Sequence, residues 1–377
     1  MRHNKKIYWD LDDKFEISSP IIRNVIFKKK LTMRKQFCNW IEKISANHTK
    51  DLDWWLTIPS SRNPYLSNLF DSICILETLD ILLKKEYIIH IKTSSKNLFQ
   101  VLQETKFVKK KNLKIFLKNK KEFKKFAFVK TIIFYSILFF YIKFFSKKID
   151  LSKKDQCILV ETYLLLNFKN KENFNKNIFR FNNKNLFLVP NFLQQKNLKL
   201  IFKKINSIDK SKYIFRENYL SVFDLIFSLL HIYRKKKFVS KHKKFNRWNL
   251  SPIVNGEINS SENYYSAVIG VANLRFFENL NKKKIHLSKI ISLFENQAAS
   301  RGWCYGSRKF FSEIDNIGYQ GYFNYSQFLN SHPCIYEEKA KILPKEIAII
   351  SKYFKKNKRE FFPRVKLILA PPLNFKI

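Results

Sequence analysis

Two residues suited to acid–base chemistry and charge stabilisation lie close together in FENQAASRGW, residues 294–303. Glu295 can act as a general base toward a hydroxyl group. Arg301, together with backbone amides, can stabilise negative charge that develops during a reaction. An apolar run before them ends abruptly in polar residues, which is how α/β proteins build a site at the carboxyl end of a strand. We therefore predict Glu295 and Arg301 as catalytic residues.

The distribution of glycine supports the same location. The chain has six glycines in 377 residues, none of them among the first 255, and four lie between residues 302 and 321. Glycine is favoured where the backbone needs φ > 0 or must approach another group closely. We therefore expect Arg301 and Gly302 to open a loop after a strand. The substrate-binding residues predicted from this region are Asn296, Gln297, Gly302, Trp303, Gly306, Tyr319, Gln320 and Gly321.

Strands must deliver these groups to one place. Residues 290–294 are predicted as a strand that ends at Glu295, and residues 317–319 as a second strand that ends at Gln320. If the two strands are neighbours, their carboxyl ends form one crevice. Elsewhere the periodicity of apolar residues indicates alternating strands and helices, hence an α/β fold. The other predicted strands are 7–9, 87–92, 157–166, 185–192, 212–220, 346–350 and 365–370, and the predicted helices are 67–83, 93–105, 221–237 and 263–281.

A turn with the sequence SSRNP, residues 60–64, precedes the helix predicted from Ser67. Hydroxyl groups and an arginine ahead of a helix N-terminus suit a bound anion. Arg62 and Asn63 are therefore further candidate binding residues. Simple N-capping of the helix is the alternative interpretation.

The chain is strongly basic. Lysine and arginine number 72 against 30 aspartates and glutamates, which gives a formal net charge of +42. Such a balance favours a polyanionic partner, such as nucleic acid or an anionic membrane surface. Abundant Lys, Asn, Ile and Phe are also what an AT-rich genome encodes, and phosphate-binding surfaces favour Arg, which is scarce here. Charge alone therefore identifies no partner.

Cysteines and known motifs narrow the classes of function. The five cysteines are scattered and form no CxxC pair, which favours a reducing compartment over a disulfide framework or a zinc site. No signal-peptide pattern is present at the start of the sequence. The chain lacks GxGxxG, P-loop, GxSxG and HExxH motifs, and its seven histidines show no metal-ligand spacing. We predict neither a metal nor a cofactor.

Residues 107–148 differ from the rest in being both basic and aromatic. Within them only residues 131–142 are free of charge, and a bilayer span needs roughly 20 apolar residues. Lys130 and Lys143 can extend the apolar length by snorkelling. Three interpretations remain open: a helix in the membrane interface against anionic lipid, a buried core helix, and a transmembrane span.

Four stretches resemble a known family. LFENQAASRGWCYGSRKF, GYQGYF, LNSHPCIYEEKAKILPKEIAII and FFPRVKLILAPPLNF are similar to bacterial surface-carbohydrate (lipopolysaccharide, O-antigen or capsule) biosynthesis proteins of the GT-B glycosyltransferase type. DWWLTIPSSRNPYLSNLFDSIC and YIFRENYL resemble the amino half of that family. Within the matching stretches, the resemblance adds Pro333 and Glu337 to the site residues already predicted. This chain has Tyr319 where related enzymes often carry a histidine beside the Gln-Gly pair.

The resemblance implies a fold and a reaction. The fold would be GT-B, with residues 1–344 as a Rossmann-like, acceptor-side α/β domain and residues 345–377 as the start of an incomplete, apparently truncated donor-binding domain. The reaction would be metal-independent transfer from a nucleotide-sugar donor to a glycan or polyprenol-linked acceptor. It would take place at the cytoplasmic face of the inner membrane. Either a partner protein would supply the missing donor domain, or the chain would be a truncated gene product.

Two other functions compete with this interpretation. The charge and the interleaved aromatic residues are compatible with a nucleic-acid-binding protein, for which affinity falls steeply with salt. The lysines are spread along nearly every segment, which makes nucleic acid the less favoured partner. A non-catalytic remnant or scaffold would instead expose an apolar face where a second domain docks.

Overall fold

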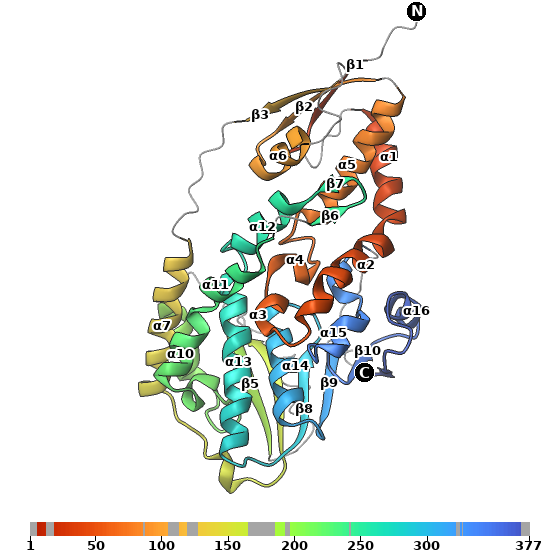
Figure 1. Ribbon diagram of the computed structural model, residues 1–377. Coiled ribbons are helices and arrows are strands. Elements are labelled where there is room, and N and C mark those ends of the chain that lie inside the picture. Colours follow the sequence, from red (N-terminus) through yellow and green to blue (C-terminus); the bar gives the residue numbers. More distant parts are fainter. Residues whose placement is uncertain are drawn as a thin grey trace, which may run out of the picture.

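The computed structural model describes residues 6–12, 19–85, 87–104, 113–118, 127–164, 185–192, 197–240, 243–321, 325 and 327–370. The molecule is elongated and has two lobes, each built around a parallel β-sheet (Figure 1). Helices and strands alternate along the chain in both lobes. The fold is therefore α/β, as the sequence predicts.

The smaller lobe contains a three-stranded parallel sheet in the order β1-β2-β3. Alternate residues of a strand face opposite sides of a sheet, and Ile7, Trp9, Ile89 and Ile91 form its buried face. The strands are β1 (Lys6–Asp10), β2 (Ile88–Thr93) and β3 (Leu113–Leu117), and the helices of this lobe are α1 (Pro20–Thr32), α5 (Leu69–Lys84) and α6 (Lys96–Glu104).

Short elements connect the two lobes. They share one apolar core with the smaller lobe, in which Trp54 and Trp248 are fully buried. The elements are α2 (Arg34–Ser45), η1 (Ala46–His48), α3 (Leu52–Trp55), α4 (Ile58–Ser61), the antiparallel hairpin β6 (Lys244–Phe245) and β7 (Trp248–Asn249), and α12 (Ser251–Asn259).

The larger lobe contains a six-stranded parallel sheet in the order β11-β10-β9-β8-β4-β5. Every residue of β5 is buried, as expected for a parallel sheet covered on both faces. The strands are β4 (Cys157–Leu164), β5 (Leu186–Phe192), β8 (Leu287–Leu293), β9 (Asp315–Gln320), β10 (Glu346–Ile349) and β11 (Leu367–Leu369). The α-helices are α7 (Ala127–Phe145), α9 (Leu198–Ser207), α10 (Val222–Leu229), α11 (His231–Arg234), α13 (Tyr264–Lys282), α14 (Ala298–Phe310), α15 (Ile335–Lys339) and α16 (Phe354–Arg359). The 3-10 helices are η2 (Leu151–Lys153), η3 (Arg216–Tyr219), η4 (Lys235–Phe238) and η5 (Leu329–Ser331).

The sheet topology differs from the predicted division of the chain. β10 pairs with β9 and β11 pairs with β10, so the described part of residues 345–377 extends the large sheet across the expected boundary after residue 344. Residues 1–344, predicted as one domain, contribute strands to both sheets. The predicted strand 212–220 is wrong in large part: Tyr213 makes a single bridge to Leu188, and the chain then turns into η3.

Within the basic apolar segment 107–148, the described residues include β3 (Leu113–Leu117) and helix α7 (Ala127–Phe145). Helix α7 contains the apolar part of the segment. By length and composition it is the one helix among the described residues that could cross a membrane, over Phe128–Phe145 at a mean hydropathy of 1.7. About a third of that window is buried, and Tyr135, Leu138 and Ile142 belong to the core of the larger lobe. One face of α7 therefore fits the interpretation of a core helix, and its other face is exposed.

Candidate functional site

The strand order of the large sheet reverses between β4 and β8. In chain order its strands run second, first, third, fourth, fifth and sixth across the sheet, so the order reverses between the first strand, β4, and the third, β8. Pairing between these two strands ends at Val160 and Ile291, while β4 continues to Leu164. Open parallel sheets bind ligands outside the carboxyl ends of their strands at such a reversal point. The fold therefore marks this edge as the candidate site.

Three polar side chains meet there. The Tyr163 hydroxyl, from β4, donates to Glu295 Oε2 over 3.3 Å, and Gln297 Nε2 donates to the same oxygen over 2.7 Å. Glu295 and Gln297 follow the end of β8, and all three side chains are half-buried. They are ordered by mutual hydrogen bonds and still partly accessible to solvent.

Burial raises the pKa of Glu295, although the hydrogen bond from Tyr163 acts in the opposite direction. A general base works best when its pKa lies near the operating pH. Perturbed carboxyl groups at the edge of a sheet are candidates for such a role. Both the position and the protonation behaviour of Glu295 therefore suit acid–base chemistry.

A second carboxyl group lies behind the first. Glu161, in the middle of β4, is 2% exposed, and its Oε1 accepts from Asn191 Nδ2 over 2.8 Å. Burial raises the pKa of Glu161 to about 7, with a further increase from the charge of Glu295 and opposing effects of Asn191 and Arg216. Its Oε2 has no hydrogen-bond partner among the described residues. Two carboxyl groups in different environments can divide acid and base roles between them.

Arg216 holds the surroundings of Glu161 in place. Its guanidinium group donates to the carbonyl oxygen of Pro190 over 2.7 Å and also to the side-chain oxygens of Asn191 and Asn273. These bonds connect η3, β5 and α13 behind the sheet edge. Because Arg216 is 1% exposed, its function here is to position Asn191 and through it Glu161.

Four other predicted residues form a separate cluster. Arg62 Nη2 and Arg301 Nη2 both contact Glu337 Oε1, at 2.7 and 2.6 Å. Asn296 Nδ2 donates to the same oxygen over 3.1 Å, and the amide of Cys334 donates to Glu337 Oε2 over 3.0 Å. None of the four predicted side chains is more than 3% exposed. We call Arg62, Asn296, Arg301 and Glu337 the buried arginine network.

The hydrogen-bond donors of Arg301 already have partners in and around this network. Its Nη1 donates to the carbonyl oxygen of Trp55 and to Ser60 Oγ, and its Nε donates to Asn296 Oδ1. Burial lowers the pKa of Arg301 to about 10, with Glu337 opposing the decrease. The network joins α3 and α4 to α14 and α15, so its geometry is that of a structural clamp between segments of the chain.

The predicted loop at Arg301 and Gly302 is wrong, because both residues lie in α14. A Cβ atom on Gly302 would lie 2.0 Å from the carbonyl oxygen of Gly270 in α13, and one on Gly306 would lie 2.9 Å from Leu274 Cα. No glycine of the chain has positive φ, whereas Arg62 and Asn296 do, at 54° and 51°. The glycines of α14 therefore allow two helices to cross closely.

Other predicted residues pack in the interior. Trp303 is fully buried against Phe276 and Phe277, with ring centroids 6.3 and 4.8 Å away. Asn63 accepts from the amide of Tyr65 over 2.9 Å and so orders the turn before α5. The predicted N-capping of the helix at residues 60–64 is not what occurs, since the N-cap of α5 is Asn68.

The second strand end lies where the sequence places it. β8 and β9 are neighbours in register, with Leu293 opposite Tyr319, so Gln320 ends the strand beside Glu295. The side chains of Tyr319 and Gln320 are buried. A Cβ atom on Gly321 would lie 2.6 Å from the ring of Tyr319, which explains the glycine at this position.

Sequence reasoning missed Glu161, Tyr163, Asn191 and Arg216. The available signal was a carboxylate inside the otherwise apolar strand CILVETYLLL, since charged residues are rarely fully buried unless paired. Within the described residues, no group of three or more His, Cys, Asp or Glu side chains is arranged to hold a metal ion. No family model, curated protein or solved structure matches this chain.

Proposed function

We propose that the chain is a metal-independent glycosyltransferase of GT-B type, which acts in the assembly of a bacterial surface polysaccharide. The observation that supports it most directly is the location of Glu295 at the reversal point of an open parallel sheet, with Tyr163 and Gln297 bonded to it. A raised carboxyl pKa at such a position is the expected property of a general base.

In the proposed reaction, the protein itself carries out one proton transfer. The acceptor hydroxyl oxygen forms a bond to the anomeric carbon of the donor sugar while the bond from that carbon to the phosphate oxygen breaks. Glu295 takes the hydroxyl proton, and the nucleotide leaves with the electron pair of the broken bond. The donor is a nucleotide sugar and the acceptor a glycan or polyprenol-linked sugar at the cytoplasmic face of the inner membrane.

Two parallel α/β sheets in one chain support a GT-B arrangement. In this proposal the large sheet binds the donor nucleotide, because its carboxyl edge contains Glu295 and faces the connecting helices α3 and α4. The hydrogen bond from Arg301 to Trp55 holds that edge against α3. A donor-binding domain from a partner is then unnecessary.

The test is release of nucleotide from a panel of uridine, guanosine and cytidine nucleotide sugars, with polyprenyl phosphate or glycan acceptors. We expect acceptor-dependent release with one class of donor, and its loss in Glu295→Gln. Acceptor-dependent release that is unchanged in Glu295→Gln would remove Glu295 from the mechanism. Absence of donor binding across the panel, measured by calorimetry, would contradict the proposed function.

A second candidate function, nucleic-acid binding, is favoured by the outer face of the small sheet. Tyr8, His90 and Phe116 form an aromatic row there, with ring centroids 4.9 and 6.1 Å apart, and Lys6 lies over the Tyr8 ring. Exposed aromatic rings beside cations can stack unpaired bases. Binding of single-stranded oligonucleotides that weakens steeply with salt and is lost in Tyr8→Ala would support it. No binding at low salt would exclude it.

A further inference from the structure

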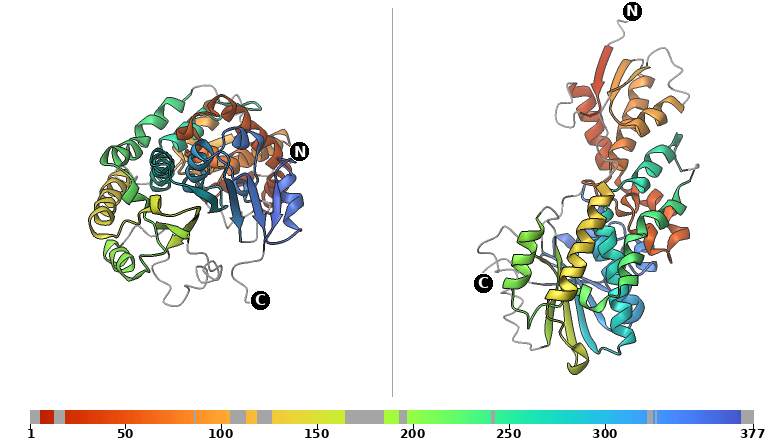
Figure 2. Two further views of the ribbon diagram at one scale, coloured as in Figure 1. Left: turned by 90° about the horizontal axis from the view of Figure 1, so that it is seen from below. Right: turned by 90° about the vertical axis from the view of Figure 1, so that its left-hand side faces the viewer.

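Helix α7 has two apolar faces. Thr131, Tyr135, Leu138 and Ile142 face the core, and each is at most 7% exposed. Ile133, Ile137, Phe140 and Phe144 repeat the same spacing two residues later, and their exposed fractions run from 39% to 72%. An offset of two residues is about 200° around a helix, so the second row lies on the opposite side. Figure 2, right, shows α7, coloured yellow, on the outside of the larger lobe.

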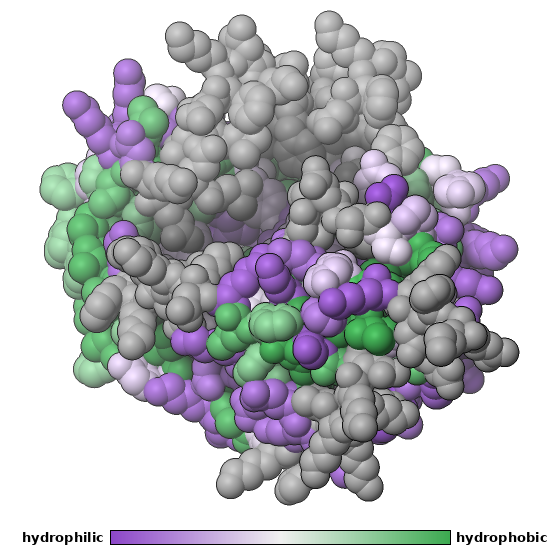
Figure 3. All heavy atoms as spheres, turned by 90° about the horizontal axis from the view of Figure 1, so that it is seen from above, coloured by the Kyte–Doolittle hydropathy of each residue, from purple (hydrophilic) through white to green (hydrophobic). Residues whose placement is uncertain are grey.

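Helix α10, beside α7, differs from an ordinary surface helix. It buries Asp224 and Ser228 together with Leu225, whereas Phe223 is 83% exposed and Ile226 and Phe227 are 47% and 40% exposed. A surface helix normally turns its apolar side to the core and its polar side to water. The exposed sides of α7 and α10 together form what we call the apolar face. Apolar residues gather on the corresponding side of the molecule in Figure 3.

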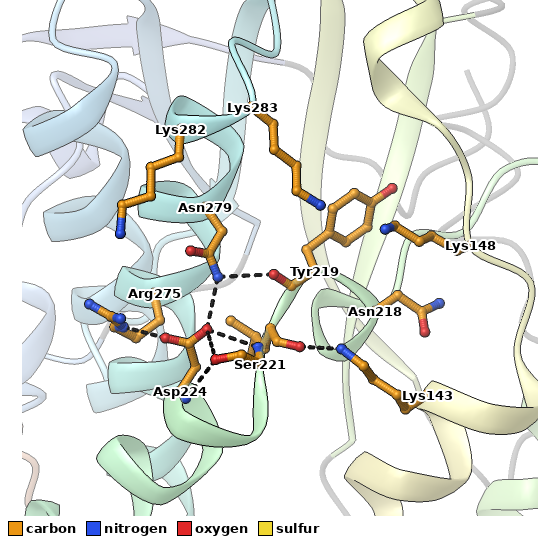
Figure 4. Close-up of a pocket in the computed structure, with 11 residues that line it drawn as sticks. Lys143, Lys148, Asn218, Tyr219, Ser221, Asp224, Arg275, Asn279, Lys282 and Lys283 are labelled. Carbon is orange, nitrogen blue, oxygen red and sulfur yellow. Dashed lines mark hydrogen bonds and ion pairs between the residues drawn. The ribbon is translucent and has the colours of Figure 1, made fainter.

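A basic pocket of about 450 Å³ adjoins the apolar face. Lys143 from the end of α7 and Ser221 and Asp224 from the start of α10 line one side of it, and Lys282 and Lys283 from the end of α13 line the other. In Figure 4 the amino groups of Lys148 and Lys283 approach the ring of Tyr219, at 5.7 and 5.9 Å from its centre. The pocket lies at the amino edge of the large sheet, opposite Glu295.

The cations of the pocket outnumber its acidic groups. Among the described residues, Arg275 contacts Asp224 and Glu278, and Lys282 contacts Glu278. Lys143, Lys148 and Lys283 form no ion pair with a described carboxylate, and Lys143 donates to the carbonyl oxygen of Leu220. Burial lowers the pKa of Lys283, and the nearby charge of Lys148 lowers it further. A bound anion would offset this mutual repulsion.

We propose that the apolar face inserts into the interface of an anionic phospholipid membrane while the basic pocket binds a lipid phosphate group. Exposed aromatic rings suit the boundary between headgroups and acyl chains, and adjacent lysines attract an anionic surface. A docked protein domain would cover the same apolar residues, but it would have no general need for a neighbouring pocket lined by several lysines. Charge complementarity therefore favours an anionic membrane over a protein domain as the partner of the apolar face.

The proposal stands independently of sugar transfer, because its surface lies at the opposite edge of the sheet from Glu295. The test is co-sedimentation of the full chain with phosphatidylcholine vesicles, prepared with and without phosphatidylglycerol. We expect binding that requires phosphatidylglycerol and weakens with salt. Lys148→Glu with Lys283→Glu should lower the partition coefficient by about 25-fold or more, since each of the two basic residues near an anionic surface contributes about a factor of five. Phe144→Ser with Phe223→Ser should lower it by at least about tenfold.

Matched controls lie on the far side of the larger lobe. Lys352→Glu with Lys355→Glu changes the charge equally, and Tyr353→Ser removes an exposed aromatic ring, without touching the apolar face. These control variants should bind vesicles like the parent chain, although the charge control has the same net charge as the pocket variant. All substituted positions are exposed or line a surface pocket, so circular dichroism should show unchanged folding.

Four results would overturn the proposal. They are no binding to either vesicle, equal binding to pure phosphatidylcholine, charge-control variants as weak as the pocket variants, and complete displacement by inorganic phosphate. A dimer in solution that Phe144→Ser with Phe223→Ser converts to monomers, without vesicle binding by the parent chain, would assign the apolar face to a second copy of the chain.

Discussion

Glu295 and Asn296 are neighbours in the chain, yet they belong to two polar clusters with opposite properties. Glu295 contacts Tyr163 and Gln297 at a half-exposed sheet edge. Asn296 turns inward, through a left-handed backbone conformation, to the buried arginine network. Among the described residues, the carboxyl group of the first cluster has no cationic partner in direct contact, while the second cluster places one carboxylate between two guanidinium groups.

This difference indicates that the first cluster is the candidate site and that the second has a structural role. A carboxyl group that is partly desolvated and bonded to neutral donors keeps a raised pKa and remains able to exchange a proton. A carboxylate that contacts two buried arginines balances their charge, and its loss would leave buried positive charge uncompensated. We therefore expect changes in the first cluster to affect activity and changes in the second to affect stability.

Glu295→Gln should give the largest effect. The amide cannot accept the proton of an acceptor hydroxyl, so the proposed transfer rate should fall by about 10²- to 10⁴-fold, the usual contribution of a general base. Donor affinity and the thermal midpoint should stay close to those of the parent chain. Glu313→Gln, at an exposed position before β9, is the matched control and should leave the rate unchanged. A large decrease in thermal stability with little change in rate would reverse the assignment of the two clusters.

Glu337→Gln should give the largest loss of stability. It removes the carboxylate that both Arg62 and Arg301 contact in the interior, and breaking a buried pair in this way costs about 3–5 kcal/mol of unfolding free energy. Denaturant titration measures the change.

Glu338→Gln is the control from the adjacent residue. The side chain of Glu338 is 34% exposed and pairs with Arg308 near the surface. Such pairs contribute about 0–1 kcal/mol. Equal losses in the two variants would show that the arginine network is no more important for folding than a surface ion pair.

Glu161→Gln should stabilise the chain in a pH-dependent way. The pKa of Glu161 is raised from 4.5 to about 7 in the folded state, so folding favours the protonated form. The contribution of Glu161 to stability is therefore fully present below the pKa of the unfolded state, and it is lost as the pH rises through the pKa of the folded state. Gln does not titrate, so the stability difference between variant and parent should grow by about 2–3 kcal/mol from about pH 5 to about pH 8. Thermal melts across that range measure it, and a constant difference would contradict the raised pKa.

Local pattern was sufficient for much of the fold. The strand 185–192 and the helix 263–281 agree with β5 and α13 to within one residue, because continuous apolar runs and helical spacing mark these elements directly. The adjacency of the strands ending near Glu295 and Gln320 is also confirmed. Consecutive strands usually pair when a helix connects them, so a local interpretation succeeds there.

Pairing between distant segments could not be predicted in the same way. β4 lies beside β8 although more than 100 residues separate them, and this pairing alone brings Tyr163 to Glu295. The strand predicted at 212–220 has apolar residues but packs as η3, because Arg216 bonds to Asn191 and Asn273. Tertiary contacts of this kind override local propensity.

The glycines of α14 were also misinterpreted from local sequence, because their role depends on contacts with α13. Whether Gly302→Ala raises or lowers the unfolding free energy tests that role. Glycine lowers helix propensity by about 1 kcal/mol relative to alanine, so an exposed helical glycine replaced by alanine gains stability. Here the added Cβ would lie 2.0 Å from the carbonyl oxygen of Gly270, and overpacking of this kind costs about 1–3 kcal/mol. We expect a net loss of stability for Gly302→Ala and a smaller one for Gly306→Ala, whose nearest contact would be 2.9 Å away. A gain in unfolding free energy for Gly302→Ala would show that α13 and α14 are farther apart than described, and would restore the interpretation that these glycines serve a substrate.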